Sequence, residues 1–197
     1  MIRDESIESY LGRLASGEPT PGGGATGALA VAEGAGLLAM AARFSAAEED
    51  ARSSEGLIAA CLGLADGDER GFGAVAEAFR LPRDTPEARS RRSAAIQAAL
   101  AEAVRPPRGI VDAAARALDL AERVLDAANP NVLSDVGAAL GCVRGGLTAA
   151  AVTLAGPIGF VGLAAPVVAR LLSRVVPALQ RHLVLVPAAG LLGALIV

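Results

Sequence analysis

Residues 25–44 are almost all small and apolar, and this stretch constrains the fold more than any other feature of the chain. Alanine loses no side-chain entropy in a helix, so the stretch predicts a long helix. A helix that is apolar on every side must be surrounded by other parts of the protein. The chain is 53% hydrophobic but only 3% aromatic, and the alternating runs typical of strands are scarce. We therefore predict an all-α fold of thin, closely packed helices.

Helix breakers divide the rest of the chain into further helices. The prolines and glycines of residues 19–24 exclude a helix there and separate the apolar stretch from a first helix. Gly63, Gly67 and Gly71 recur in a third helix, where they either allow another helix to approach closely or mark a break near Gly67. The predicted helices cover residues 4–16, 25–44, 47–79, 86–104, 107–128 and 134 onward.

The charge and the cysteine usage exclude several classes of protein. The formal net charge is −3 and every basic side chain except one histidine is arginine, so we expect no nucleic-acid partner. Cys61 and Cys142 are isolated, which is typical of buried, reduced thiols. His182 is the only histidine, and the carboxylates show no ligand spacing, so we expect no metal site. Residues 1–20 are polar and acidic, which predicts no signal peptide and a cytoplasmic protein.

The last part of the chain differs in character. Residues 145–169 contain no charged side chain, and a stretch of that length could cross a bilayer. We expect the sixth helix to continue to about Leu154 and to break at Gly156–Pro157. The chain is therefore divided into a bundle domain, residues 1–148, and an atypical apolar helical tail, residues 149–197.

Three segments of the bundle domain resemble the formiminotransferase-cyclodeaminase and methenyltetrahydrofolate cyclohydrolase family. In chain order they are Pro19–Gly24, then Asp68, Phe72, Phe79–Arg83 and Ala94–Gln97, then Asn129–Asn131 and Ser134–Gly137. The resemblance implies an antiparallel helical bundle that forms a homodimer and takes a folate substrate without any further cofactor. It implies one of two activities. These are cyclodeamination of formimino-tetrahydrofolate to the methenyl form with ammonia release, and hydrolysis of methenyl- to formyl-tetrahydrofolate.

The glycine loop of this family corresponds to Pro21, Gly22, Gly23 and Gly24, which are candidate substrate-binding residues. Bare N–H groups at the start of a helix, with the helix dipole behind them, favour an anion such as a folate carboxylate. The alternative is that these glycines only shape a tight turn into the helix. The resemblance also suggests that Arg83 meets the glutamate tail of the substrate.

Asp135 is the first candidate for acid–base catalysis. Both reactions move a proton at a tetrahedral carbon between two nitrogens, and a partly buried carboxyl can do this. The alternative is a helix N-cap, a role that Ser134 could also take. Asn131 and Ser134 are then candidate donors of hydrogen bonds to the substrate. Asp68, which matches the family's aspartate four residues before Phe72, is the second candidate catalytic residue, and its alternative is a solvated acidic surface.

Parts of the tail resemble the membrane permeases that import iron–siderophore complexes and vitamin B12. The similar segments are residues 155–166, 169–172 and 185–194. A lone fragment cannot form a translocation path, which needs many packed helices. We interpret the tail as a fusion, a truncation or a gene-model artefact, and expect any membrane contact only through it. The alternative is a divergent final helix pair of the enzyme.

The sequence therefore predicts a folate one-carbon enzyme, either a cyclohydrolase or a cyclodeaminase. The alternative is a non-catalytic helical module for folate binding or dimerisation, fused to a non-functional permease fragment. The acidic run Glu48–Asp50 favours this alternative, because family members often carry basic residues there and an acidic run repels an anionic glutamate tail.

Overall fold

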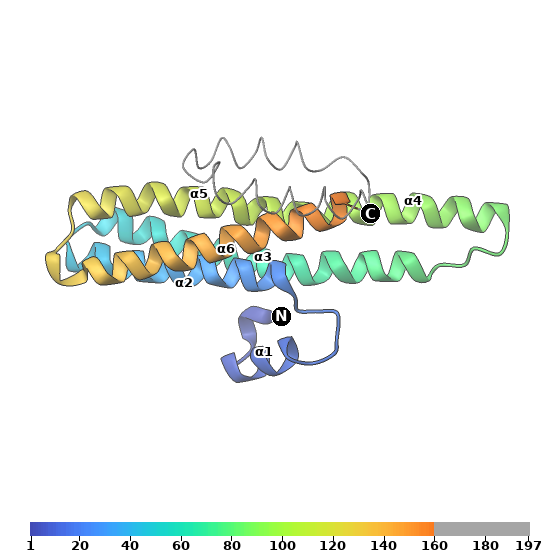
Figure 1. Cartoon of the computed structure of the whole chain (residues 1–197), viewed down its shortest axis with the longest axis horizontal. Helices are drawn as coiled ribbons and strands as arrows, with labels where there is room; N and C mark the ends of the chain where they lie inside the picture. The colour runs from blue at the N-terminus through green and yellow to red at the C-terminus, as the bar shows by residue number, and fades with distance from the viewer. Residues whose placement is uncertain (160–197) are drawn as a thin grey trace, which may run out of the picture. The chain divides into compact units, whose positions relative to one another are not determined.

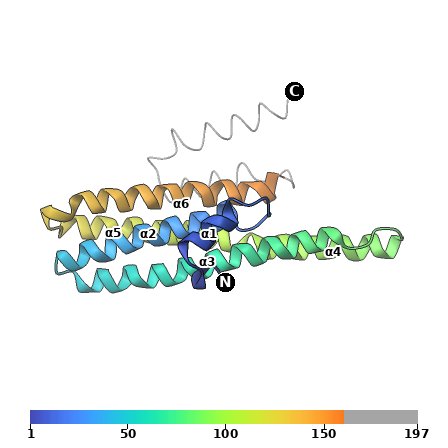
Figure 2. The same cartoon turned by 90° about the horizontal axis from the view of Figure 1, so that it is seen from below.

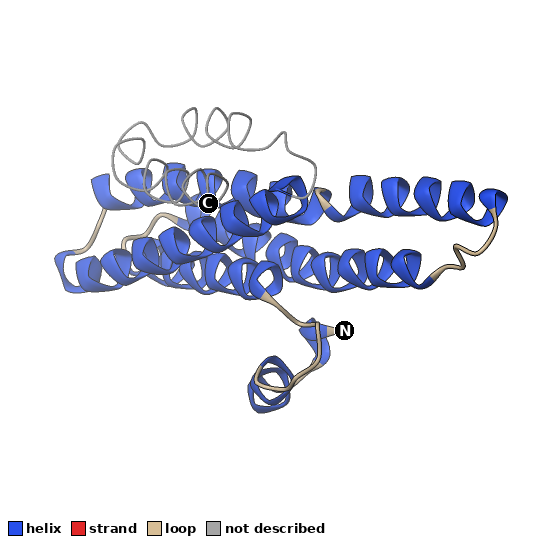
Figure 3. Cartoon of the chain, turned by 45° about the vertical axis from the view of Figure 1, so that its right-hand side comes forward, coloured by secondary structure: helices blue, strands red, loops and turns tan. Residues whose placement is uncertain are grey.

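The computed structural model describes residues 1–159, and all the regular elements within that part are helical (Figures 1 and 3). The predicted all-α class is thus confirmed. Residues 1–150 form one compact unit, to which the following description applies. The elements are η1 (Ile2–Asp4), α1 (Ile7–Leu14), α2 (Gly23–Phe44), α3 (Glu48–Arg80), α4 (Pro86–Ala103), α5 (Arg105–Asp126), η2 (Pro130–Val132) and α6 (Leu133–Gly159).

Helix α2 is the centre of the bundle, as its small apolar residues predict. Val31, Ala35 and Leu38 are fully buried. By length and hydropathy α2 and residues 130–155 could each cross a membrane, but most of α2 is buried inside the protein. The core helix of a soluble protein meets the same criteria, so α2 carries no evidence for a membrane span.

Contact between α2 and α6 is made backbone to backbone. A Cβ atom added to Gly146 would lie 2.5 Å from the carbonyl oxygen of Gly27, and one added to Gly34 would lie 2.8 Å from that of Ala139. Gly27 therefore faces residue 146 while Gly34 faces residue 139, so the two helices run antiparallel. Such proximity leaves no room for a side chain at these glycines.

Helix α3 is continuous from Glu48 to Arg80, so Gly67 does not mark a break. Close approach of another helix, the other interpretation, is correct for Gly67 and Gly71, whereas a Cβ atom on Gly63 would meet the Arg3 side chain at 3.3 Å. A Cβ atom on Gly67 would lie 3.2 Å from Pro106 Cγ, and one on Gly71 would lie 3.2 Å from Ala103 Cα. The end of α4 and the start of α5 therefore pack closely on α3. Beyond that point α3 and α4 extend side by side past the N-terminal end of α2 (Figures 1 and 2).

Two expectations about helix faces and ends need correction. The helical spacing of Ile7, Tyr10, Leu11 and Leu14 predicts an apolar stripe on α1 that faces the protein. Of these residues only Tyr10 is buried, at 8% exposed, whereas Ile7 and Leu11 are 79% and 52% exposed. The predicted break at Gly156–Pro157 is wrong, because α6 continues to Gly159. Proline removes one hydrogen bond, and a helix often tolerates that loss with a bend. The expectation for the rest of the tail concerns residues outside the described part.

The close contact between α2 and α6 predicts opposite effects for two glycine substitutions. Gly146→Val should lower the free energy of unfolding by about 1–3 kcal/mol, because its Cβ atom would overlap the backbone of α2. Gly56→Ala is the matched control, since nothing lies within 4 Å of its added Cβ. It should raise stability by up to about 1 kcal/mol through helix propensity. Denaturant unfolding measures both, and a Gly146→Val chain as stable as the unaltered one would contradict this packing.

Candidate functional site

The carboxylate of Asp68 lies against the N-terminal end of α2. The main-chain N–H of Ala25 donates a hydrogen bond of 3.0 Å to Asp68 Oδ2. A Cβ atom on Gly24 would overlap the Asp68 carboxylate, so glycine at this position is what admits the carboxylate. The glycine loop and Asp68 were predicted separately from the sequence, and the fold brings them together. Gly23, the next residue of the loop, is exposed and accessible to a ligand.

Burial determines the protonation of Asp68. Removal from water raises the pKa of its carboxyl, and the hydrogen bond from the Ala25 N–H lowers it by less. A carboxyl that keeps its proton to higher pH than usual is suited to exchanging protons with a substrate near neutrality. Asp68 also occupies the positive end of α2, where the sequence predicted that a substrate anion binds. This placement favours Asp68 as the acid–base group and leaves the anion site on Gly22 and Gly23 as a prediction.

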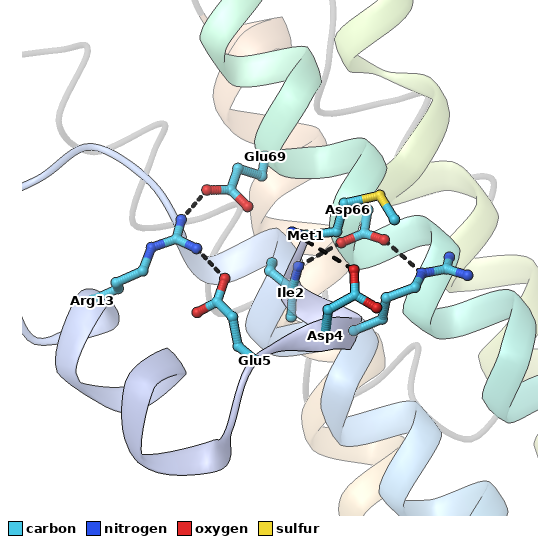
Figure 4. A network of polar contacts seen from close by, with 8 residues as sticks. Met1, Ile2, Asp4, Glu5, Arg13, Asp66 and Glu69 are labelled. Atoms are coloured by element: carbon cyan, nitrogen blue, oxygen red, sulfur yellow. Dashed lines mark hydrogen bonds and ion pairs between the residues drawn. The ribbon is translucent and has the colours of Figure 1, made fainter.

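The N-terminal segment, residues 1–14, is fixed against α3 by polar contacts with Asp66 and Glu69 (Figure 4). The buried carboxylate of Asp66 accepts a hydrogen bond of 2.7 Å from the N–H of Ile2 and one of 2.8 Å from Arg3 Nε. Arg13 pairs with both Glu5 and Glu69. Sequence analysis missed these contacts, because Asp66 and Glu69 belong to an acidic run that gives no signal of its partners.

Two carboxylates of α3 have opposite pKa shifts although only one residue separates them. Burial alone would raise the pKa of Asp66, but the hydrogen bonds from Arg3 and Ile2 outweigh it and lower the pKa. Among the residues that the structure describes, Asp68 has no cationic partner of this kind, and the effect of burial on its pKa prevails. The two carboxyls therefore differ in their surroundings, and the catalytic role of Asp68 stays a prediction.

The second predicted cluster, Asn131, Ser134 and Asp135, lies near the opposite end of α2. The main-chain N–H of Asn129 donates to Ser45 Oγ at 3.0 Å, just after the last residue of α2. Taking the rise of 1.5 Å per residue along α2, Asp135 is roughly 24 Å from Asp68. Helix α6 already begins at Leu133, so Ser134 and Asp135 lie in its first turn and neither is its N-cap.

Arg83 lies in the connection between α3 and α4, at the far end of the paired helices. It follows Asp68 by twelve helical residues and a short loop, which places it about 18 Å or more from Asp68, on the side away from Asp135. A single chain therefore brings together Asp68 with Pro21–Gly24, and leaves the other predicted site residues at a distance.

Comparison with known proteins identifies the family. A sequence profile described as formiminotransferase-cyclodeaminase matches residues 6–155. A methenyltetrahydrofolate cyclohydrolase of Methylorubrum extorquens is 36% identical over 165 residues, which cover 78% of this chain and 79% of that protein. The fold, the glycine loop beside a half-buried carboxyl and these matches together define a folate one-carbon enzyme. The chain belongs to the formiminotransferase-cyclodeaminase family.

Two further relatives carry the cyclodeaminase name. The formimidoyltransferase-cyclodeaminase of Mus musculus is 27% identical over 146 residues, which are 68% of this chain but only 27% of that longer protein. The crystal structure of formiminotetrahydrofolate cyclodeaminase from Thermotoga maritima has the same fold, with a TM-score of 0.70, 19% identity and full coverage of both chains. The permease resemblance of the tail finds no support in these comparisons, since the family match extends to residue 155.

The raised pKa of Asp68 predicts that this carboxyl costs stability. Its folded-state pKa lies above the unfolded value, so its contribution to stability is complete below the unfolded pKa and is lost as the pH rises through the folded pKa. Asp68→Asn keeps an acceptor for the Ala25 N–H without the charge. At pH 7 this variant should melt at or above the temperature of the unaltered chain, with the difference vanishing below about pH 4.

The control for this experiment is Asp66→Asn. The pKa of Asp66 is lowered, so its contribution to stability is present above the unfolded pKa and is lost on acidification. Asp66→Asn should therefore melt below the unaltered chain at pH 7. Equal losses of stability in both variants would show that Asp68 is an ordinary structural carboxylate.

Proposed function

We propose that this chain is a methenyltetrahydrofolate cyclohydrolase. The observation that carries the proposal is its 36% identity to a protein of that name across most of both chains. The second candidate activity is cyclodeamination of formimino-tetrahydrofolate, which the names of the mammalian relatives and the fold of the Thermotoga maritima protein favour. A soluble folate enzyme of this kind belongs in the cytoplasm.

The position of Asp68 suits the proposed hydrolysis. The oxygen of water forms a bond to the methenyl carbon, the electron pair of the carbon–nitrogen double bond moves to nitrogen, and the ionised Asp68 accepts the proton of the water. Asp68 then returns this proton to the departing nitrogen, which keeps the electron pair of the breaking carbon–nitrogen bond as the ring opens. The hydroxyl of the adduct releases its remaining proton to the Asp68 carboxylate and becomes the carbonyl of the formyl group, which stays on the other nitrogen. This sequence of addition and elimination requires only proton transfer, so we expect no cofactor besides the folate itself.

The substrate test compares both folates on one preparation. We expect the full chain to consume methenyl-tetrahydrofolate, followed by the loss of its absorbance, and to release little ammonia from formimino-tetrahydrofolate. Asp68→Asn should reduce kcat by at least about a hundredfold, the usual scale of acid–base catalysis. Ammonia release as the faster reaction would establish the cyclodeaminase instead. Turnover of neither substrate would support the non-catalytic module.

We also propose that the chain forms a homodimer through α6. Gly137, Gly141 and Gly145 are exposed along one side of α6, and an added Cβ on any of them would meet no atom of the described residues within 4 Å. A second α6 could therefore approach closely along this side. In an antiparallel pair with its two-fold axis near Gly141, Asp135 of the partner subunit comes level with residue 147 of the first chain.

Residue 147 of α6 lies beside the first turns of α2. Gly27 packs on Gly146, about one helical turn from Gly24 and its neighbour Asp68. The pairing thus brings the second predicted cluster of the partner to the same level along α6 as the first cluster, whereas within one chain the two clusters lie at different levels. We propose that Asp68 from one chain and Asp135 from the other serve the same site.

Mixing two inactive variants tests the shared site. Asp68→Asn and Asp135→Asn should each lose activity, and a refolded equimolar mixture should recover about a quarter of the normal activity, because half of the dimers are mixed and each has one intact site. A mixture as inactive as its components would refute the sharing. A monomeric, active chain in sedimentation analysis would refute the dimer itself.

A further inference from the structure

We propose that Tyr10 is a positioning residue of the folate site, acting through the glycine loop. This inference rests on the proposed function, and it concerns a residue of the N-terminal segment that the chemistry described above does not use. Tyr10 is 8% exposed, and its hydroxyl lies 3.1 Å from Thr26 Oγ1. It is the one apolar-stripe residue of α1 that is buried, and it points to the first turns of α2.

The Thr26 hydroxyl has a single proton, and this determines which group donates in each of its hydrogen bonds. The Thr26 hydroxyl donates its single proton to the carbonyl oxygen of Gly22, at 3.0 Å. Thr26 Oγ1 can then only accept from Tyr10, so the Tyr10 hydroxyl is the donor. The result is a chain of two hydrogen bonds from Tyr10 through Thr26 to the main chain of the glycine loop.

This chain of bonds fixes the orientation of one peptide group. The carbonyl of Gly22 also accepts the main-chain N–H of Thr26 at 3.0 Å, so two donors hold it toward α2. A trans peptide group is planar, with its C=O and N–H pointing in opposite directions. The N–H of Gly23 must therefore point away from α2, into the space at its N-terminal end. Gly23 is exposed, and Asp68 lies against the neighbouring Gly24.

The ring of Tyr10 is itself buried, but the rest of α1 adds little apolar packing, and polar contacts fix the helix. Ile7 and Leu11 are largely exposed, so α1 buries little apolar surface. The pairing of Arg13 with Glu5 and Glu69 fixes α1 against α3 instead. The position of the Tyr10 hydroxyl is thus set from α3, the helix that carries Asp68. Tyr10 couples the orientation of the Gly23 N–H to the position of the catalytic carboxyl.

Tyr10→Phe removes only the hydroxyl and tests this role. The KM for methenyl-tetrahydrofolate should rise about five- to tenfold while kcat changes less than about twofold, since the loosened N–H serves substrate binding. Thr26→Val should give the same change, and the double variant should be no worse than either single one, because all three interrupt the same chain of bonds. Thr26→Ser keeps the hydroxyl and should restore the normal KM.

Ser9→Ala is the control, because the exposed Ser9 side chain lies on the same helix outside this chain of bonds. An unchanged KM in Tyr10→Phe, with or without a lower melting temperature, would show that Tyr10 only attaches α1 and would overturn the inference while leaving the proposed function intact. An unaltered chain that neither binds nor converts either folate would overturn both. Additive effects of Tyr10→Phe and Thr26→Val would also overturn it, since two independent contacts would then be involved.

Discussion

The structure depends on how closely other groups can approach the backbone of α2. Glycine and alanine at its surface let the backbone of α6 come within van der Waals contact on one side. The same lack of side chains lets the Asp68 carboxylate reach the first turn at Gly24. Each glycine in a helix costs conformational entropy, which the close packing must offset. The glycine and alanine residues of α2 thus allow both the close packing inside the bundle and the approach of Asp68, the proposed acid–base group.

The proposed chemistry follows from a difference between neighbouring carboxylates. Asp66 is buried with an arginine and a main-chain donor, so it is held ionised and fastens the N-terminal segment. Asp68 is half-buried and accepts one main-chain hydrogen bond, so the pKa of its carboxyl is raised and ionisation is disfavoured. A buried carboxyl without a cationic partner lowers stability, and such local costs are common where a group must exchange protons.

The sequence was sufficient to predict the elements but not the distances between them. The long apolar helix and the fold class followed from propensity and from helix breakers, although α2 begins at Gly23, two residues earlier than predicted and inside the stretch expected to exclude a helix. Pairing of Asp68 with Gly24 could not be predicted, because it depends on the register of α3 against α2, which no local pattern specifies. The separation of Asp135 from Asp68 escaped prediction for the same reason. The continuation of α6 through Pro157 was mispredicted, because proline disfavours a helix without forbidding it.

The attachment of the N-terminal segment makes one part of the molecule sensitive to ionic strength. Arg3 and Arg13 hold this segment through ion pairs that are partly open to water, whereas α2 is held by apolar contacts. Dissolved salt screens these ion pairs but hardly affects the apolar contacts of α2. The segment therefore belongs to the least stable cooperative unit, whose opening free energy falls as salt is added, while global unfolding changes little. Amide exchange in residues 7–14 and in the bundle should accordingly respond to salt to very different degrees.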